Sequence, residues 1–122
     1  MTWLGLALAG GLGAVCRFLL DALVRRRWDA PIPVATLLIN VLGSFALGVL
    51  VGWLGEVAGA ADVRTIVGTG FLGGFTTFST AAVEVALLGR ERRWLAGIVL
   101  GLGMLGLGLA AAAGGLALGH AL

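Results

Sequence analysis

The residues of this chain that can do chemistry are the few polar side chains inside long apolar stretches. Polar groups in a lipid bilayer are costly and usually face a protein interior or an aqueous path. The second apolar stretch contains Asn40 and Ser44, which are one helical turn apart and therefore share a face of a helix. They fit two roles: interhelical hydrogen bonds, or an anion path that uses the two N–H donors of the amide.

The third apolar stretch is rich in glycine and hydroxyl residues. Gly73 and Gly74 weaken a helix, and the hydroxyl groups that follow compete for backbone partners. These hydroxyl residues are Thr76, Thr77, Ser79 and Thr80. We therefore predict a break in this helix at mid-membrane, and the alternative is a continuous packing helix. A break frees main-chain carbonyl oxygens, which in transporters commonly coordinate a small hard cation.

Phenylalanines and one carboxylate complete this stretch. Phe71, Phe75 and Phe78 are spaced by four and three residues, so they share a helical face. Such a stripe usually packs against another helix, although the positive edge of an aromatic ring also favours a small anion. Glu84 fits three roles, as an interfacial anchor, a partner for an arginine or a proton carrier. The single cysteine, Cys16, fits a packing role.

The elements that position these residues must be membrane-spanning helices. The 122-residue chain is 60% hydrophobic and 11% charged, with a mean hydropathy of +1.10, so it has more apolar surface than a soluble domain of this length can bury. Its apolar stretches are long enough to cross a hydrocarbon core of about 30 Å. They cover about Trp3–Leu20, Val34–Leu54, Thr65–Leu88 and Trp94–Leu118. We expect an all-α membrane protein with a single transmembrane domain over residues 1–122, whose first stretch is a span rather than a signal peptide because it lacks a basic start.

The distribution of arginine predicts the topology. All eight basic residues are arginines. Three lie in the first connection, Asp21–Pro33, and three in the third, residues 90–93, whereas the second connection has only Arg64. Positively charged loops stay cytoplasmic, so we predict a multi-pass protein of the cell membrane with both termini outside. Arginines in such short loops form no face that could track a nucleic acid.

Small residues in the spans indicate close helix packing. Gly97 with Gly101, and Gly10 with Ala14, have the four-residue spacing that lets two helices touch. Four thin helices enclose a pore poorly on their own, so we expect association with a second subunit.

Three short segments follow one another in a specific order and spacing. They are GGLGAVCRF at residues 10–18, NVLGSF at 40–45 and GFLGGFTTFST at 70–80. In these segments, and over essentially its whole length, the chain resembles the Fluc (CrcB) family of fluoride channels. The resemblance implies an antiparallel dimer of four-helix subunits, with two fluoride pathways and one structural sodium ion (Na+) at the dimer interface.

The same resemblance implies roles for individual residues. The main-chain carbonyls of Gly73 and Thr76 would hold the sodium ion, each subunit giving the same pair. Asn40 would donate to fluoride, and Phe78 would be the first of two pore phenylalanines. The remaining implied residues are Thr77, Ser79 and Thr80 along the path and Arg17 at a wide aqueous entrance.

The chain departs from the family pattern in two places. Ala81 and Ala82 stand where a second pore phenylalanine and a serine are usual, and the fourth span, residues 95–118, has no Ser, Thr, Asn or Tyr. Phe75, one turn before Phe78, is a candidate replacement for the missing ring. The arginine bias fixes one orientation, so the gaps and the bias together predict a heterodimer with a paralogous subunit of opposite topology.

The function expected from these features is passive efflux of fluoride through a selective channel, which needs no catalysis. One alternative is a proton-coupled small multidrug transporter, whose mechanism typically needs a carboxylate in the first span that this chain lacks. Another is a non-conducting accessory subunit of a heterodimeric channel. We do not expect an enzyme, because no nucleophile–base pair or carboxylate pair can be assembled from these spans.

Overall fold

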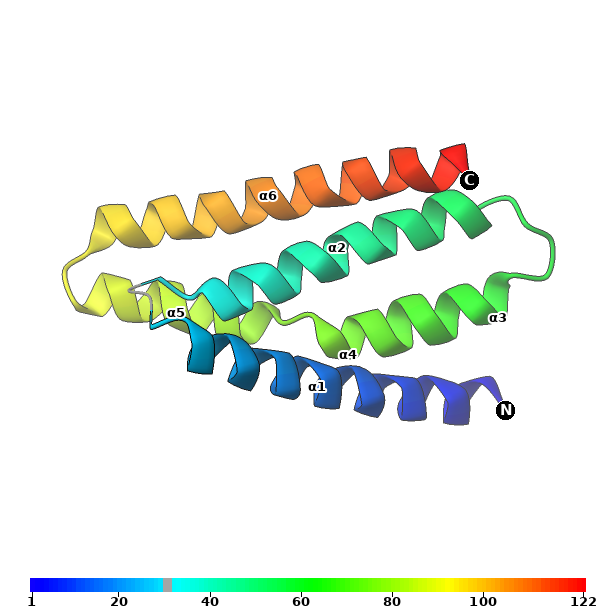
Figure 1. Ribbon diagram of the computed structural model, residues 1–122, viewed down its shortest axis with the longest axis horizontal. Coiled ribbons are helices and arrows are strands. Elements are labelled where there is room, and N and C mark those ends of the chain that lie inside the picture. The colour runs from blue at the N-terminus through cyan, green and yellow to red at the C-terminus, as the bar shows by residue number, and fades with distance from the viewer. Residues whose placement is uncertain (30–31) are drawn as a thin grey trace.

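The computed structural model describes residues 1–29 and 32–122, and in this part the chain forms a bundle of four long apolar helices (Figure 1). The long continuous helices are α1 (Thr2–Arg27), α2 (Val34–Leu54) and α6 (Trp94–Ala121). The third spanning segment, Ala61–Arg90, is divided. Its parts are α3 (Ala61–Val63), the π-helix η1 (Arg64–Leu72), α4 (Gly73–Phe75) and α5 (Phe78–Arg90). The predicted class, an all-α membrane protein with a broken third helix, is confirmed.

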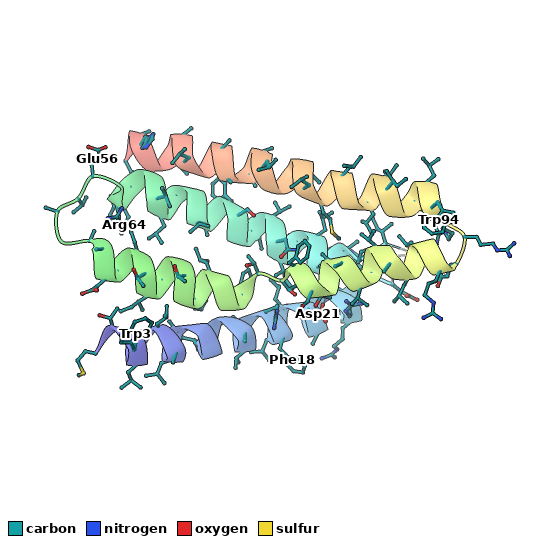
Figure 2. The ribbon with its side chains drawn as sticks, turned by 180° about the vertical axis from the view of Figure 1, so that it is seen from behind. Trp3, Phe18, Asp21, Glu56, Arg64 and Trp94 are labelled. Carbon is teal, nitrogen blue, oxygen red and sulfur yellow. The ribbon has the colours of Figure 1, made fainter. Side chains whose placement is uncertain are left out.

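The two chain termini lie at the same end of the bundle, together with the connection between α2 and α3 (Figure 1). The connection between α5 and α6 lies at the other end, where α1 also ends. Tryptophans mark both ends, with Trp3 at one and Trp94 at the other (Figure 2). Large apolar side chains such as Phe18 point away from the bundle, as expected when the surrounding solvent is lipid.

The first helix is longer than the sequence predicted. We expected a polar connection from Asp21, but α1 continues to Arg27. A salt bridge of 2.9 Å between Asp21 Oδ2 and Arg25 Nε stabilises this last part, since residues four apart are neighbours on a helix. At the other end of the connection, Pro33 directly precedes α2.

The break in the third spanning segment was predicted from the glycine doublet and the hydroxyl residues after it, and it lies at the first two of those hydroxyl residues. Gly73 and Gly74 are helical within α4, and the extended residues are Thr76 (φ −77°, ψ 161°) and Thr77 (φ −147°, ψ 121°). Gly74 serves close packing instead, because a Cβ there would collide with the carbonyl oxygen of Gly10 on α1. Hydroxyl competition for backbone groups therefore decides where the helix ends.

The closest approach of α2 and α6 depends on glycines that the sequence analysis did not single out. A Cβ at Gly48 would collide with the carbonyl oxygen of Ala112, and one at Gly115 with that of Phe45. The contact of backbone against backbone replaces the hydrophobic effect, which does not drive helices together in lipid. It fixes α6 beside α2 and leaves the opposite side of α2 to face the break.

Candidate functional site

Two threonines end one helix and begin the next at the break. The Thr76 N–H and hydroxyl both donate to the carbonyl of Leu72, at 2.9 and 3.0 Å, which closes the last turn of α4. The Thr77 hydroxyl accepts from the backbone N–H of Thr80 at 3.2 Å, as expected of an N-cap threonine at the start of α5. Thr77 is also the residue that is most deeply buried here, at 7% exposed.

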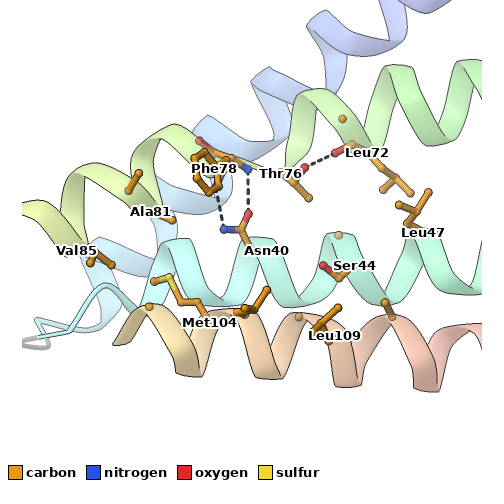
Figure 3. Close-up of a pocket in the computed structure, with 18 of the residues that line it drawn as sticks. Asn40, Ser44, Leu47, Leu72, Thr76, Phe78, Ala81, Val85, Met104 and Leu109 are labelled. Carbon is orange, nitrogen blue, oxygen red and sulfur yellow. Dashed lines mark hydrogen bonds between the residues drawn. The ribbon is translucent and has the colours of Figure 1, made fainter. Parts of the chain in front are cut away.

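The side chain of Asn40 joins α2 to the break. Its Nδ2 donates to the Thr77 carbonyl and its Oδ1 accepts from the Thr77 N–H, both at 2.9 Å (Figure 3). One amide thus satisfies both backbone groups of a residue that belongs to neither helix. An amide nitrogen carries two N–H groups, so Asn40 keeps one more donor.

The break leaves carbonyl oxygens with few partners. In an unbroken helix the Gly73 carbonyl would accept from the N–H of Thr77, but that N–H bonds to Asn40. The Thr76 carbonyl oxygen accepts a long hydrogen bond of 3.5 Å from Nη1 of Arg17, so this arginine of α1 reaches the break. Among the described residues no group of three His, Cys, Asp or Glu could hold a metal, so a cation here would rely on main-chain oxygens. Gly73 is exposed on the subunit surface, and main-chain oxygens are ligands that suit a small hard cation.

A groove of about 770 Å³ runs beside the break between α2, α5 and α6 (Figure 3). One wall, from α2 and the break, carries the polar side chains Asn40, Ser44, Thr76 and Thr77 next to the apolar Leu47 and Leu72. The facing wall from α5 and α6 is apolar and includes Ala81, Ala82, Met104 and Leu105. The two sequence departures therefore lie together on one side of the same groove.

The phenylalanines separate into two environments. The ring of Phe78 lines the groove and is 88% exposed in the single subunit. Phe75 instead stacks on Phe71, with ring centroids 6.3 Å apart and an interplanar angle of 6°, and it is not among the residues that line the groove. A pore role for Phe75 stays a prediction, and the single subunit gives it no position beside Phe78.

The predicted hydroxyl residues also divide. Thr76 and Thr77 line the groove, whereas Ser79 and Thr80 do not. The hydroxyl of Thr77 lies 3.3 Å from that of Ser79 and donates to that of Thr80 at 3.2 Å. These hydroxyl groups therefore form a small network of their own next to the break.

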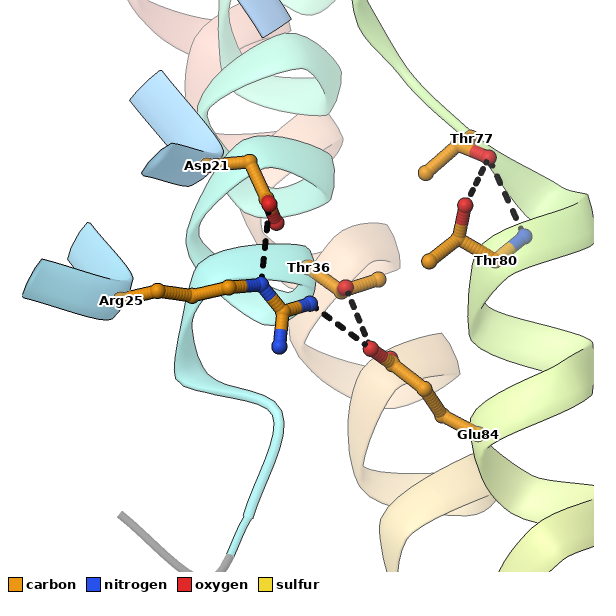
Figure 4. A network of polar contacts seen from close by, with 6 residues as sticks. All are labelled: Asp21, Arg25, Thr36, Thr77, Thr80 and Glu84. Atoms are coloured by element: carbon orange, nitrogen blue, oxygen red, sulfur yellow. Dashed lines mark hydrogen bonds and ion pairs between the residues drawn. The ribbon is translucent and has the colours of Figure 1, made fainter. Parts of the chain in front are cut away.

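A second polar network surrounds Glu84, and its other members were missed by the sequence analysis. Glu84 Oε1 accepts from Arg25 Nη2 at 3.2 Å and from the Thr36 hydroxyl at 3.1 Å, while Arg25 also pairs with Asp21 (Figure 4). Of the three roles left open for Glu84, the structure shows a partner for an arginine. Thr36 could have been found, because it lies one turn before Asn40 on the same helical face.

Comparison with known proteins places these features in a family. Residues 4–116 match the model of the family described as CrcB-like protein, Camphor Resistance (CrcB). The chain is 48% identical over 122 residues to the fluoride-specific ion channel FluC 2 of Cutibacterium acnes, with 98% of each chain covered. It is 46% identical over 116 residues to the fluoride-specific ion channel FluC 1 of Leifsonia xyli subsp. xyli, covering 95% of this chain and 85% of the relative. A third relative, the fluoride-specific ion channel FluC of Deinococcus radiodurans, is 48% identical over 122 residues, covering 96% of this chain and 94% of the relative.

Proposed function

Because the chain belongs to the CrcB family, we propose that it is a subunit of a fluoride-selective channel in the cell membrane that lets fluoride leave the cytoplasm passively. The observation that carries this proposal is the break at Thr76 and Thr77, which Asn40 holds open beside a groove. The relatives are named as ion channels, and passive efflux down a gradient needs no catalytic group.

The groove offers the donors that a small anion needs in place of water. A strongly hydrated ion enters a narrow path only where fixed groups replace its hydration shell. Asn40 and Phe78 both line the groove at the break, and they offer the second N–H of the amide and the positive edge of the ring as donors. Ser44 adds a hydroxyl one turn along α2, while Arg17 supplies a positive charge close to the break.

A structural sodium ion is part of the proposal. The carbonyl oxygens of Gly73 and Thr76 from two subunits would hold the ion where two breaks meet. When bound, the ion would neutralise the oxygens' partial charges and connect the subunits. The exposure of Gly73 and the missing helical partner of its carbonyl support this arrangement.

The second subunit of the proposed antiparallel dimer is a paralogue that inserts with the opposite topology, while this chain keeps both termini outside. Its support is the apolar wall of the groove around Ala81 and Ala82, together with the exposed ring of Phe78. The arginine-rich loops favour a single orientation of this chain, so a second copy of it would not insert the other way.

The test is reconstitution into liposomes loaded with fluoride, with release followed by a fluoride electrode. We expect release when this chain is purified together with its paralogue, and no comparable release of chloride. Release of a hydrophobic cation without fluoride would contradict the channel and favour a multidrug transporter. Fluoride conduction by this chain alone, as a stable antiparallel homodimer, would contradict the heterodimer.

The apolar wall also supports a second candidate, a non-conducting accessory subunit. A heterodimer with Phe78→Ile in this chain alone separates the two, because Phe78 is 88% exposed in the subunit and its replacement should leave folding intact. If this chain lines a pathway, the mutant heterodimer conducts less fluoride than the unaltered one. Unchanged conduction would assign transport to the partner.

A further inference from the structure

A second groove opens between α5 and α6 at the arginine-rich end of the bundle. It has a volume of about 890 Å³, within the range of known ligand sites. Its apolar part is formed by Val85, Ala86 and Ile98. The end of the groove near the connection between α5 and α6 is formed by Arg90, Arg92 and Trp94. The groove therefore has an apolar floor with two positive charges at one end.

The backbone holds Arg92 at this groove in an unusual conformation. At the end of α5 the N–H of Arg92 donates to the Gly89 carbonyl at 3.1 Å, and that of Arg93 donates to the Leu88 carbonyl at 2.9 Å. This pair of bonds is typical of a helix end at which the residue after the C-cap is left-handed and is normally glycine. Here that residue is Arg92, with φ 59°. A side chain is costly in that conformation, so the presence of arginine points to a use for its charge.

The two arginines of this groove are exposed. Arg25, at the same end of the bundle, is paired with Asp21 and Glu84. In the described part of the chain neither Arg90 nor Arg92 forms a salt bridge, and both are exposed. Glu91 lies between them in sequence but does not line the groove.

The position of the groove at the ends of two spanning helices predicts that it lies at the depth of lipid headgroups. Arg90 and Trp94 stand at the ends of two spanning helices. The indole of Trp94 packs over Gly89, where an added Cβ would lie 3.1 Å from the ring, and the side chain stays 67% exposed. Tryptophan at a helix end marks the boundary between headgroups and acyl chains.

We propose that this groove binds an anionic phospholipid, with the phosphate between Arg90 and Arg92 and an acyl chain along Val85 and Ile98. Guanidinium groups pair well with phosphate oxygens, and basic pockets between membrane helices are suited to anionic headgroups. A phospholipid fits this groove better than a small soluble anion does, because a small anion would leave the apolar floor uncovered, whereas a lipid fills both the charged end and the apolar part. The proposal does not depend on fluoride conduction.

The test uses the fluorescence of Trp94 and lipids with brominated acyl chains, which quench a nearby indole. Trp3, Trp28 and Trp53 are replaced by phenylalanine in the full chain, assembled with whatever partner it requires. The vesicles contain phosphatidylcholine with about 20% phosphatidylglycerol, enough to give an anionic surface, and bromine is placed on one lipid or the other. We expect brominated phosphatidylglycerol to quench Trp94 well beyond its share of the lipid.

Charge-removing variants distinguish a site from a general surface effect. One arginine near an anionic surface strengthens binding by a factor of about five. Arg90→Gln combined with Arg92→Gln should therefore lower the preference for phosphatidylglycerol about 25-fold. The matched control, Arg26→Gln with Arg27→Gln, removes the same charge from the end of α1 and should preserve most of the preference. Equal losses in both pairs, or quenching in proportion to bulk composition, would overturn the proposal.

A third variant separates binding from folding. Arg92→Gly relieves the left-handed backbone, so it should raise the unfolding temperature while lowering the lipid preference about fivefold. A preference unchanged by Arg92→Gly would contradict the assignment of Arg92.

Discussion

Replacing Asn40 with alanine removes the side chain that joins α2 to the break, and the structure sets the size of the effect. The amide makes two hydrogen bonds of 2.9 Å to the backbone of Thr77, which is 7% exposed. Water cannot readily replace them, and an unsatisfied buried group costs about 1–3 kcal/mol. Polar contacts between membrane helices average nearer to about 0.6 kcal/mol, because the unfolded chain also finds partners. We therefore expect Asn40→Ala to lower the free energy of unfolding by about 2–4 kcal/mol, between the limits for two bonds.

The assay is reversible unfolding in mixed micelles, followed by circular dichroism, together with fluoride release from liposomes. Ser44→Ala is the matched control for stability, since Ser44 lies on the same face of α2 and lines the same groove but forms no hydrogen bond within the described part of the chain. Asn40→Asp keeps an acceptor for the Thr77 N–H but turns an oxygen towards its carbonyl, so it should be destabilised and lose fluoride release. A stability of Asn40→Ala within about 0.5 kcal/mol of the unaltered protein would refute the reasoning, because a surface site behaves in that way.

Three further predictions concern packing and charge. Gly115→Leu should yield no monodisperse folded protein in size-exclusion chromatography, because its Cβ would collide with a carbonyl oxygen of α2. Gly114→Leu should be tolerated, since a Cβ there meets nothing within 4 Å. Equal behaviour of the two variants would contradict the close packing of α2 and α6. On α1, Gly13→Ala should lower the free energy of unfolding by about 1–3 kcal/mol, and with it the thermal midpoint, because the added Cβ collides with a carbonyl of η1. Gly11→Ala, whose Cβ would have open space around it, should leave both unchanged. Arg25→Gln should cost no more than about 1 kcal/mol, since its side chain is 53% exposed, and the difference should shrink at high salt; a loss that salt does not change would show that the pair with the α5 carboxylate is shielded from water.

Much of the fold was predictable because lipid leaves few choices. Apolar length and the positions of Trp3 and Trp94 indicated where spans begin and end, and α2 has the bounds that its apolar run suggested. The hydroxyl residues after Gly74 predicted a break, since such side chains form hydrogen bonds to their own backbone. The two bonds from Asn40 to Thr77 could not be predicted in the same way, because they join residues that are far apart in sequence.

What the sequence did not reveal depends on pairs of residues from different helices. The glycine contacts of α2 with α6 were hidden among many glycines, because only the relative rotation of two helices decides which of them touch. The network of Glu84 required the extension of α1 to carry Arg25 across to α5 and Thr36. The sequence also gave no sign of the π-helix Arg64–Leu72, for which we have no physical account.

The most direct test of the account is the rate of fluoride release from liposomes that contain the assembled channel with Phe78→Ile in this chain. The ring of Phe78 is 88% exposed in the subunit, so its replacement should leave folding intact while removing a ring edge from the groove. The account predicts a well-folded protein whose fluoride release through this chain's pathway falls to the level of protein-free liposomes. Unchanged release, with the partner's pathway blocked, would contradict the claim that fluoride passes beside the break.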